Sequence, residues 1–445
     1  MEQVSPSMML IVASATIILS FIFGEVSKRT NVPSVLMLII LGIIAKLGLD
    51  AVGLGNQNFL PVLKVLGTVG LIMIVLEAAL ELELDRDKYW AIGKALFIAL
   101  LGLVFSAWAA AEILMYFIPE MDGTTAWLYA TPLSILSSAI IIPSVLGLKG
   151  EKKEFHIYES TFSDILGIML FYFLTSQLHG ETGVHLDDPD AFEATEHSSG
   201  ALAYGGKILL SIVASLIASY GIVLIFQRIK SHVKLFLLIA VLLLLYGIGK
   251  EAHLSSLIII LIFGLMIANM RLFFQGPLKK MLRYKEARKI YEGLHVVTME
   301  TAFVVRTFFF VIFGITITLS TLFSVKVALV STAILLSIYL IRFVILRIFV
   351  GSDIFPQLFV APRGLITILL YYAIPEEVKL SEEVFNPGIL LFIIIATSLI
   401  MTVAMVADKK RTGAALRRVG QAPVGYERWR APTLAETIVE EKAEG

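Results

Sequence analysis

The chain of 445 residues contains no cysteine and little charge, with Asp, Glu, Lys and Arg making up only 16% of it. The absence of cysteine excludes disulfides and thiol chemistry. Acidic and basic residues balance at 36 each, so the charge gives no indication of a nucleic acid partner. Hydrophobic residues make up 58% of the chain, more than a soluble domain of this length shows. The composition therefore indicates an all-α polytopic membrane protein.

Apolar runs long enough to cross a bilayer as helices recur along nearly the whole chain. We place thirteen spans near residues 7–25, 33–49, 59–81, 91–118, 125–148, 156–178, 204–229, 234–249, 254–273, 294–320, 326–350, 356–375 and 387–407. The first run lacks a basic leader and a small-residue cleavage site, so we interpret it as a retained helix. The sequence thus predicts a membrane domain over residues 1–410 and a mostly disordered cytoplasmic tail over 411–445.

Lysine and arginine are concentrated in the connections that follow odd-numbered spans, as in KGEKKE at 149–154. Connections after even-numbered spans are acidic or neutral. Basic connections favour the cytoplasmic side, which predicts an amino terminus outside and a carboxyl terminus in the cytoplasm. The segment GPLKKMLRYKEARK at 276–289 is typical of an amphipathic cytoplasmic helix that contacts anionic lipid.

The sixth predicted span carries two acids, in the stretch YESTFSDILGIML from residue 158. At about 100° per residue, four polar residues share one helix face: Glu159, Ser160, Ser163 and Asp164. Thr161 and Phe162 fall outside that face. A carboxylate that faces lipid is costly, so this face must contact protein or a wet cavity. Glu159 alone could be interfacial and Asp164 could simply bond a neighbouring helix, but the deeper position of Asp164 favours a functional role.

The fifth and twelfth predicted spans are both interrupted by residues that weaken a helix. The fifth contains Pro132, Ser134, Ser137, Ser138 and Pro143, and the twelfth contains Pro362 and Gly364. The two spans are equivalent if spans one to six and eight to thirteen form inverted repeats. Such paired interruptions are typical of transporter sites, because freed backbone groups can bind ions where they line a cavity. Each break alone is ordinary, and any of the three serines could be the ligand.

Two arginines in the later spans are candidates for a buried charge network. Arg342 in the eleventh span requires an acid partner in the membrane, and Glu159 is available. Arg363, in the break of the twelfth span, either stabilises the crossing of the interrupted helices or serves the same network. Four further charges lie within predicted spans: Glu25, Glu77, Glu300 and Arg306. We interpret Glu77 as interfacial, whereas Glu300 and Arg306 could pair with each other or lie near the ion path.

The order of these motifs resembles the monovalent cation/proton antiporter superfamily over about the first four hundred residues. The resemblance rests on NVPSVLMLIILGIIA, LEAALELELD, the broken Ser-rich fifth span, the carboxylates of the sixth span and PRGL in the twelfth. The spacing of Glu159, Ser160 and Asp164, with Arg342, resembles in particular the electroneutral sodium/proton antiporters of archaea and bacteria, the NhaP-like branch.

The resemblance implies a homodimer in the cytoplasmic membrane, with two crossed discontinuous helices. Its core would lie near residues 91–178 and 294–375, with dimerisation and linker helices elsewhere. Asp164 would alternately hold a cation or a proton, and Glu159 and Arg342 would form an ion pair. Ser163 departs from the Asn or Asp that is usual in this branch, and the fifth span lacks Thr-Asp-Pro. Because of both departures, the sequence does not decide whether the transported cation is Na⁺, Li⁺ or K⁺.

A single titrating acid predicts exchange of one monovalent cation for one proton, because both compete for the same carboxylate. The alternatives are a K⁺/H⁺ antiporter or a gated K⁺ efflux pathway, although no carbonyl-lined pore loop is recognisable. No resident cofactor is expected. An intramembrane hydrolase built on His156, Ser160 and Ser163 is disfavoured, because no orienting third group or nucleophile elbow accompanies them.

Overall fold

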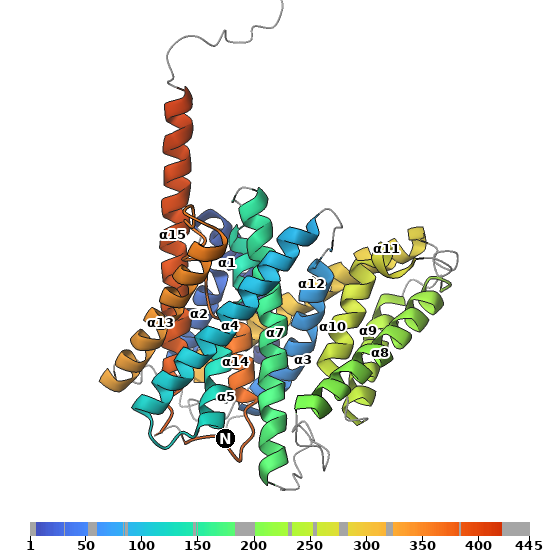
Figure 1. Cartoon of the computed structure of the whole chain (residues 1–445), viewed down its shortest axis with the longest axis horizontal. Coiled ribbons are helices and arrows are strands. Elements are labelled where there is room, and N and C mark those ends of the chain that lie inside the picture. The colour runs from blue at the N-terminus through green and yellow to red at the C-terminus, as the bar shows by residue number, and fades with distance from the viewer. Residues whose placement is uncertain are drawn as a thin grey trace, which may run out of the picture. The chain divides into compact units, whose positions relative to one another are not determined.

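The computed structural model describes residues 6–30, 32–51, 60–82, 84, 88–145, 148, 150–182, 201–229, 234–251, 256–275, 284–316, 324–381 and 384–420, and these contain helices but no strands (Figure 1). The helices are α1 (Pro6–Thr30), α2 (Ser34–Ala51), α3 (Leu60–Glu81), α4 (Tyr89–Phe117), α5 (Gly123–Ser134), α6 (Ser138–Ser144), α7 (Gly150–Thr182), α8 (Ala201–Phe226), α9 (Lys234–Glu251), α10 (Ser256–Ala268), α11 (Met270–Phe273), α12 (Tyr284–Thr316), α13 (Val325–Phe349), α14 (Leu365–Tyr372) and α15 (Gly388–Gly420). Met1–Met405 form one compact unit and Val406–Gly445 a second.

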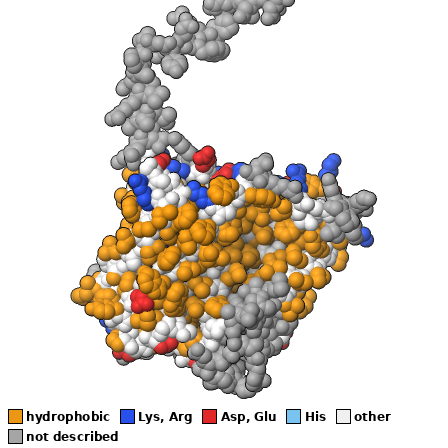
Figure 2. Space-filling model, in the orientation of Figure 1, with side chains coloured by type: hydrophobic (Ala, Val, Ile, Leu, Met, Phe, Trp, Pro, Cys, Tyr) orange, Lys and Arg blue, Asp and Glu red, His pale blue; other side chains and the backbone are white. Residues whose placement is uncertain are grey.

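Seven helical stretches among the described residues are long and apolar enough to cross a membrane. They are Leu10–Ser27, Tyr89–Phe117, Gly123–Ser144, Gly150–Thr175, Tyr284–Thr316, Val325–Phe349 and Gly388–Lys409, and shorter apolar helices cover Ile212–Phe226, Leu237–Gly249 and Leu257–Ala268. Hydrophobic side chains cover a broad band of the face shown in Figure 2, and Lys and Arg gather along one edge of that band. The chain is therefore a multi-pass membrane protein, while the exact number of thirteen spans stays a prediction.

Three helices extend beyond the bounds that hydropathy predicts. α7 begins at Gly150 instead of near residue 156, α12 begins at Tyr284 instead of near 294, and α15 continues to Gly420. The added turns contain Glu, Lys, Arg, Ala and Leu, which favour a helix once its first turns have formed. From Tyr284 on, the predicted amphipathic segment is thus the start of α12, and part of the predicted disordered tail is helical. Residues 276–283 and 421–445 lie outside the described residues.

The helices of the first unit pack in two groups. In one group, α4 contacts α5, α7 and α13, α7 contacts α5 and α6, and α14 contacts α5. In the other group, α12 contacts α1, α2 and α3, while α10 contacts α3, α8 and α9. The groups meet where α3 contacts α7 and α14. Residues 294–316 of the predicted core segment belong to α12 and therefore to the second group.

The fifth predicted span is interrupted at residues 135–137, between α5 and α6. The two prolines are not at the interruption, because Pro132 lies inside α5 and Pro143 inside α6. Instead the backbone becomes extended, with φ −74° and ψ 133° at Ile135 and φ −97° and ψ 101° at Ser137. Such a break frees backbone amides, which must find other acceptors inside a membrane protein.

Three successive amides at this break donate to groups outside their own helix. The hydrogen bonds run from Leu136 N to Ser163 Oγ at 3.0 Å, from Ser137 N to Pro362 O at 3.0 Å, and from Ser138 N to Asp164 Oδ2 at 3.3 Å. Two of the acceptors belong to α7 and the third precedes α14. The break is therefore stabilised by the segments that surround it, and it aims backbone dipoles at the carboxylate of α7.

The twelfth predicted span is helical only in its second half. Residues 355–359 form turns, residues 360–364 have no regular structure, and α14 begins at Leu365. Gly364 lies against the other break, since a Cβ at this position would come within 2.6 Å of Ser137 Oγ. Only glycine allows this approach. Together with the hydrogen bond from Ser137 to Pro362, this contact shows that the two interrupted segments meet.

Candidate ion-binding site

Asp164 lies on α7 beside the break between α5 and α6. The residue is 2% exposed, and its Oδ2 accepts the hydrogen bond from the Ser138 amide. Its other oxygen, Oδ1, has no hydrogen-bond partner. A buried ionised carboxylate with an unpaired oxygen is costly, and a proton or a cation removes that cost by supplying positive charge. The arrangement therefore suits a group that binds one of these two at a time.

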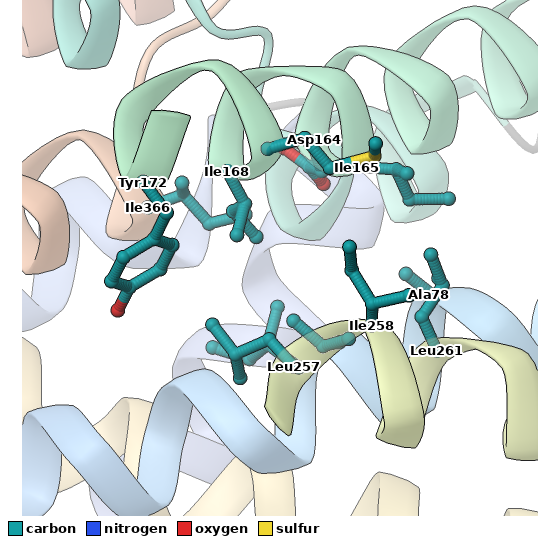
Figure 3. A pocket seen from close by; sticks show the side chains of 12 residues that line it. Ala78, Asp164, Ile165, Ile168, Tyr172, Leu257, Ile258, Leu261 and Ile366 are labelled. Atoms are coloured by element: carbon teal, nitrogen blue, oxygen red, sulfur yellow. The ribbon is translucent and has the colours of Figure 1, made fainter. Parts of the chain in front are cut away.

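The Asp164 carboxylate borders a small cavity whose wall comes from α3, α7, α10 and α14. Apolar side chains form most of this wall, among them Ala78, Ile168, Ile258 and Ile366 (Figure 3). Asp164 is the only acid among the lining residues. Because α7 and α14 belong to one group of helices and α3 and α10 to the other, the cavity lies where the two groups meet.

The serines that the sequence predicts as ligands make different contacts. Ser160 Oγ donates to His156 O at 2.7 Å, Ser134 Oγ donates to Ala130 O at 2.9 Å, Ser163 Oγ accepts from Leu136 N, and Ser137 and Ser138 donate their backbone amides at the break. A hydroxyl that donates its proton keeps lone pairs for a cation. Ser160 and Ser134 thus keep coordinating capacity, whereas Ser163 has a structural contact.

Glu159 and Arg342 form a buried ion pair. Arg342 Nη1 donates to Glu159 Oε1 at 2.7 Å, and Nη2 donates to Oε2 at 2.9 Å. The guanidinium also donates to the backbone carbonyls of Gln357, Leu358 and Val360 at 3.0 to 3.2 Å. This bidentate contact with a carboxylate depends on the planar geometry of the guanidinium. The pair therefore fixes α7 and α13 to the irregular segment that precedes α14.

A second small cavity lies on the other side of α7. Its polar lining comprises Ser106, Ser134, Glu159, Ser163, Arg342 and Arg363. Arg363 is 2% exposed, and its Nε donates to Leu133 O at 2.8 Å while its Nη1 donates to Ala361 O at 3.0 Å. Leu133 belongs to the last turn of α5, where carbonyls lack partners within the helix. Arg363 thus stabilises the meeting of the two breaks.

The polar face predicted for α7 is divided between the two cavities. Asp164 borders the first cavity, whereas Glu159 and Ser163 border the second. The predicted polar face therefore does not border a single cavity. Thr161, which the sequence analysis places off that face, lies only about 60° from Asp164 around the helix and is completely buried. Its closeness to Asp164 follows from the sequence once these two positions are compared directly.

His156 is placed to contact Glu159 and not to activate Ser160. The imidazole is completely buried, and its Nδ1 lies 3.4 Å from Glu159 Oε2. The Ser160 hydroxyl instead donates to the backbone carbonyl of His156. A serine nucleophile needs a nearby base, such as an imidazole nitrogen, that accepts the proton of its hydroxyl. The geometry therefore does not support the hydrolase alternative.

Arg306 pairs with Glu77, a partner that the sequence analysis did not consider. Arg306 Nη2 donates to both oxygens of Glu77, at 3.0 and 2.9 Å, and links α12 to α3. Both side chains are largely buried, at 18% and 16% exposure, so Glu77 has a charged partner within the bundle. Glu300 is exposed and lies about 120° around α12 from Arg306. The helical period therefore already places Glu300 and Arg306 on different sides of α12, which disfavours a pair between them.

We expect Ser163→Ala to destabilise the protein by about 1–3 kcal/mol, because it leaves the buried Leu136 amide without an acceptor. Thermal unfolding of the purified protein in detergent measures this loss. Ser134→Ala is the matched control: Ser134 borders the same cavity, but its hydroxyl only donates to a carbonyl one turn back in its own helix. Equal melting temperatures for the two variants would contradict a structural role for Ser163.

Known proteins are similar to this chain over most of its length. Residues 14–407 match a family model described as sodium/hydrogen exchanger, transmembrane. No curated protein matches the chain. The fold is similar to a structure of the sodium proton antiporter MjNhaP1 from Methanocaldococcus jannaschii at pH 8, with a TM-score of 0.64, 18% identity, and coverage of 92% of this chain and 97% of the other. An electron-microscopy map of the same antiporter gives a TM-score of 0.60 at 19% identity, covering 96% and 100%.

Proposed function

Because the chain belongs to the sodium/hydrogen exchanger family, we propose that it is a secondary active antiporter that exchanges Na⁺ or Li⁺ for H⁺, with Asp164 as the shared binding group. The family assigns the chain to cation/proton transport and not to enzymatic catalysis. The observation that carries our assignment of the site is the Asp164 carboxylate, which is buried, bonded to the break through Oδ2 and unpaired at Oδ1.

Competition for one carboxylate would couple the two fluxes. Because the cavity wall around Asp164 is apolar, the ionised carboxylate has a high free energy. Either a proton or a monovalent cation neutralises it. If the helices shift past each other only when Asp164 is neutral, each passage moves one cation or one proton and never both. Exchange then follows without any contact between the two passengers.

Alternating access needs a site at a movable junction, and the cavity beside Asp164 provides one. One part of its wall belongs to the helix group of α7 and α14, and the other part belongs to the group of α3 and α10. The meeting breaks, the Glu159–Arg342 pair and Arg363 all lie within the first group, so that group would carry the site as one body. We propose that this group moves against the other to expose Asp164 to each side in turn.

We propose an orientation with the amino terminus outside and the carboxyl terminus in the cytoplasm. The ion pairs between Lys88 and Glu154 and between Lys152 and Asp353 occur at the end of the bundle where α7 begins, and Figure 2 shows Lys and Arg along one edge. Basic residues favour the cytoplasmic side. Homodimerisation in the cytoplasmic membrane and contact with anionic lipid stay predictions from the sequence.

The exchange itself is tested in proteoliposomes that contain a pH-sensitive dye. We expect Na⁺ or Li⁺ added outside to drive proton movement in the opposite direction, with saturation at high cation concentration. Parallel measurements with K⁺ separate the alternatives: K⁺-driven, saturable proton movement would replace Na⁺ by K⁺, and K⁺ flux without proton movement would indicate an efflux pathway. No cation-dependent proton movement with any of the three salts would refute the proposal.

We further expect the exchange to be electroneutral, because one acid accepts one monovalent cation or one proton. The initial rate of Na⁺-driven proton movement should then not change when a membrane potential is imposed with a gradient of a permeant anion such as thiocyanate, which leaves the cations balanced. A rate that follows the imposed potential would show that more than one proton moves per cation. A second titrating group would then have to be identified.

A further inference from the structure

Thr161 lies one turn before Asp164 on α7 and shares its side of the helix. The two positions are separated by about 60° around the axis, which places their Cβ atoms about 5–6 Å apart. Thr161 is completely buried and Asp164 is 2% exposed. Their side chains are therefore close neighbours in a region without bulk water.

The hydroxyl of Thr161 differs from those of the other buried serines and threonines described on α7, namely Ser160, Ser163 and Thr175, each of which has a hydrogen-bond partner. Thr175 Oγ1 donates to Phe171 O at 3.0 Å on the same helix, and Ser160 Oγ donates to His156 O. Thr161 Oγ1 has no hydrogen-bond partner, and neither has Asp164 Oδ1. Buried polar atoms are nearly always satisfied, so an unpaired one requires an explanation. Two such oxygens on one helix face, one turn apart, point to a bound species that both contact.

Thr161 does not itself line the cavity beside Asp164, but it lies on the stripe of α7 that leads to the cavity. Measured around α7 from Asp164, Ile168 lies at about 40° and Tyr172 at about 80°, and both line the cavity (Figure 3). Thr161 lies between these angles and continues the same stripe of α7 towards the beginning of the helix. All other α7 residues on the cavity wall besides Asp164 are apolar or aromatic. Thr161 is thus the hydroxyl on this stripe that lies within one turn of the carboxylate.

We propose that Thr161 is a further ligand of the transported alkali cation, which it holds through Oγ1 together with Asp164 Oδ1. Hard cations take oxygen ligands at roughly 2.3–2.6 Å, so one ion can bridge two oxygens on neighbouring positions of a helix. A hydroxyl is neutral and keeps two lone pairs. Thr161 would therefore increase cation affinity without changing the number of charges exchanged. This inference rests on the function proposed above for Asp164.

The test replaces the hydroxyl by a methyl group of similar size in Thr161→Val. We expect the concentration of Na⁺ or Li⁺ that gives half-maximal exchange to rise by about tenfold, as for the loss of one contact to a charged group, while Thr161→Ser stays near wild type. Thr175→Val on the same helix is the matched control, because its hydroxyl donates to a backbone carbonyl and the residue lies about three turns beyond Asp164. Thr161→Ala serves as a second variant if Thr161→Val does not fold.

Several results would overturn this inference. They are an unchanged half-maximal concentration in Thr161→Val or Thr161→Ala, an equal rise in Thr175→Val, or no recovery in Thr161→Ser. A merely structural role would lower the melting temperature and leave the half-maximal concentration unaffected. The thermal stabilisation of the purified protein by NaCl or LiCl gives an independent binding measurement and should weaken in Thr161→Val alone. If the wild type lacked exchange, or Asp164→Asn retained it, the proposed function itself would fail first.

Discussion

Asp164→Asn should abolish cation-driven proton movement and leave the protein folded. The amide has nearly the size of the carboxylate, and its oxygen can still accept from the Ser138 amide, as Oδ2 does at 3.3 Å. It can neither release a proton in the working range nor offer a negative charge to a cation. We therefore expect the rate in proteoliposomes to fall to that of vesicles without protein. Removing a buried ionisable group should also leave the melting temperature unchanged or raised.

A second acid-to-amide change on the same helix provides the control. Glu151 lies in the first turn of α7 and is exposed, so Glu151→Gln removes a carboxylate that is outside both cavities. This variant should exchange at the wild-type rate. Residual exchange in Asp164→Asn above the background of empty vesicles would show that the coupled carboxylate lies elsewhere. A variant without exchange that also fails to fold would have to be replaced by Asp164→Ser before any conclusion.

The sequence predicted a break in both the fifth and the twelfth span and located the one in the twelfth, where Pro362 and Gly364 lie in the irregular residues 360–364, but it did not locate the one in the fifth. Prolines and serines indicate that a helix is weak, yet Pro132 and Pro143 both lie within helical turns. The position of the break depends on where the freed amides find acceptors, and those acceptors belong to α7 and to the segment before α14. Such long-range partners are absent from the local pattern, so the sequence alone could not locate the interruption.

The ion pair of Glu159 with Arg342 was predictable because buried charges in a membrane protein require partners, and the structure has this pair. The partner of Arg306 could not be predicted from charges within its own predicted span. Its actual partner, Glu77, is on α3. Which helices lie side by side is a property of the packed bundle, so pairing across helices is ambiguous wherever more than one acid is available.

Helical angles located Asp164 on a polar side of α7 but could not separate the two cavities. Glu159 and Ser163 face one cavity and Asp164 the other, although all three fall within about 140° of the helix. The division depends on α4 and α13 covering one side and α3 and α10 covering the other. Periodicity therefore predicts which residues are buried together, whereas the neighbouring helices determine which of them can meet the same ion.

Glu159→Ala should destabilise the folded protein by about 3–5 kcal/mol, because it leaves a buried guanidinium without its counter-charge. Arg342 is 9% exposed and Glu159 is 1% exposed, so both charges are shielded from bulk water. We expect a lower yield of folded protein and a large fall in its melting temperature in detergent. Glu77→Ala offers a comparison, since the pair with Arg306 is more exposed, at 16% and 18%, and its loss should cost less.

Replacing both partners separates the cost of an unpaired charge from the value of the pair itself. In Glu159→Leu combined with Arg342→Met, no buried charge is left, and exchanging a buried ion pair for apolar side chains is often neutral or stabilising. Here the carbonyls of Gln357, Leu358 and Val360 would also lose their donor. We therefore expect the double variant to be more stable than Glu159→Ala but less stable than the wild type. A melting temperature of Glu159→Ala equal to that of the wild type would show that the pair does not hold α7, α13 and the segment before α14 together.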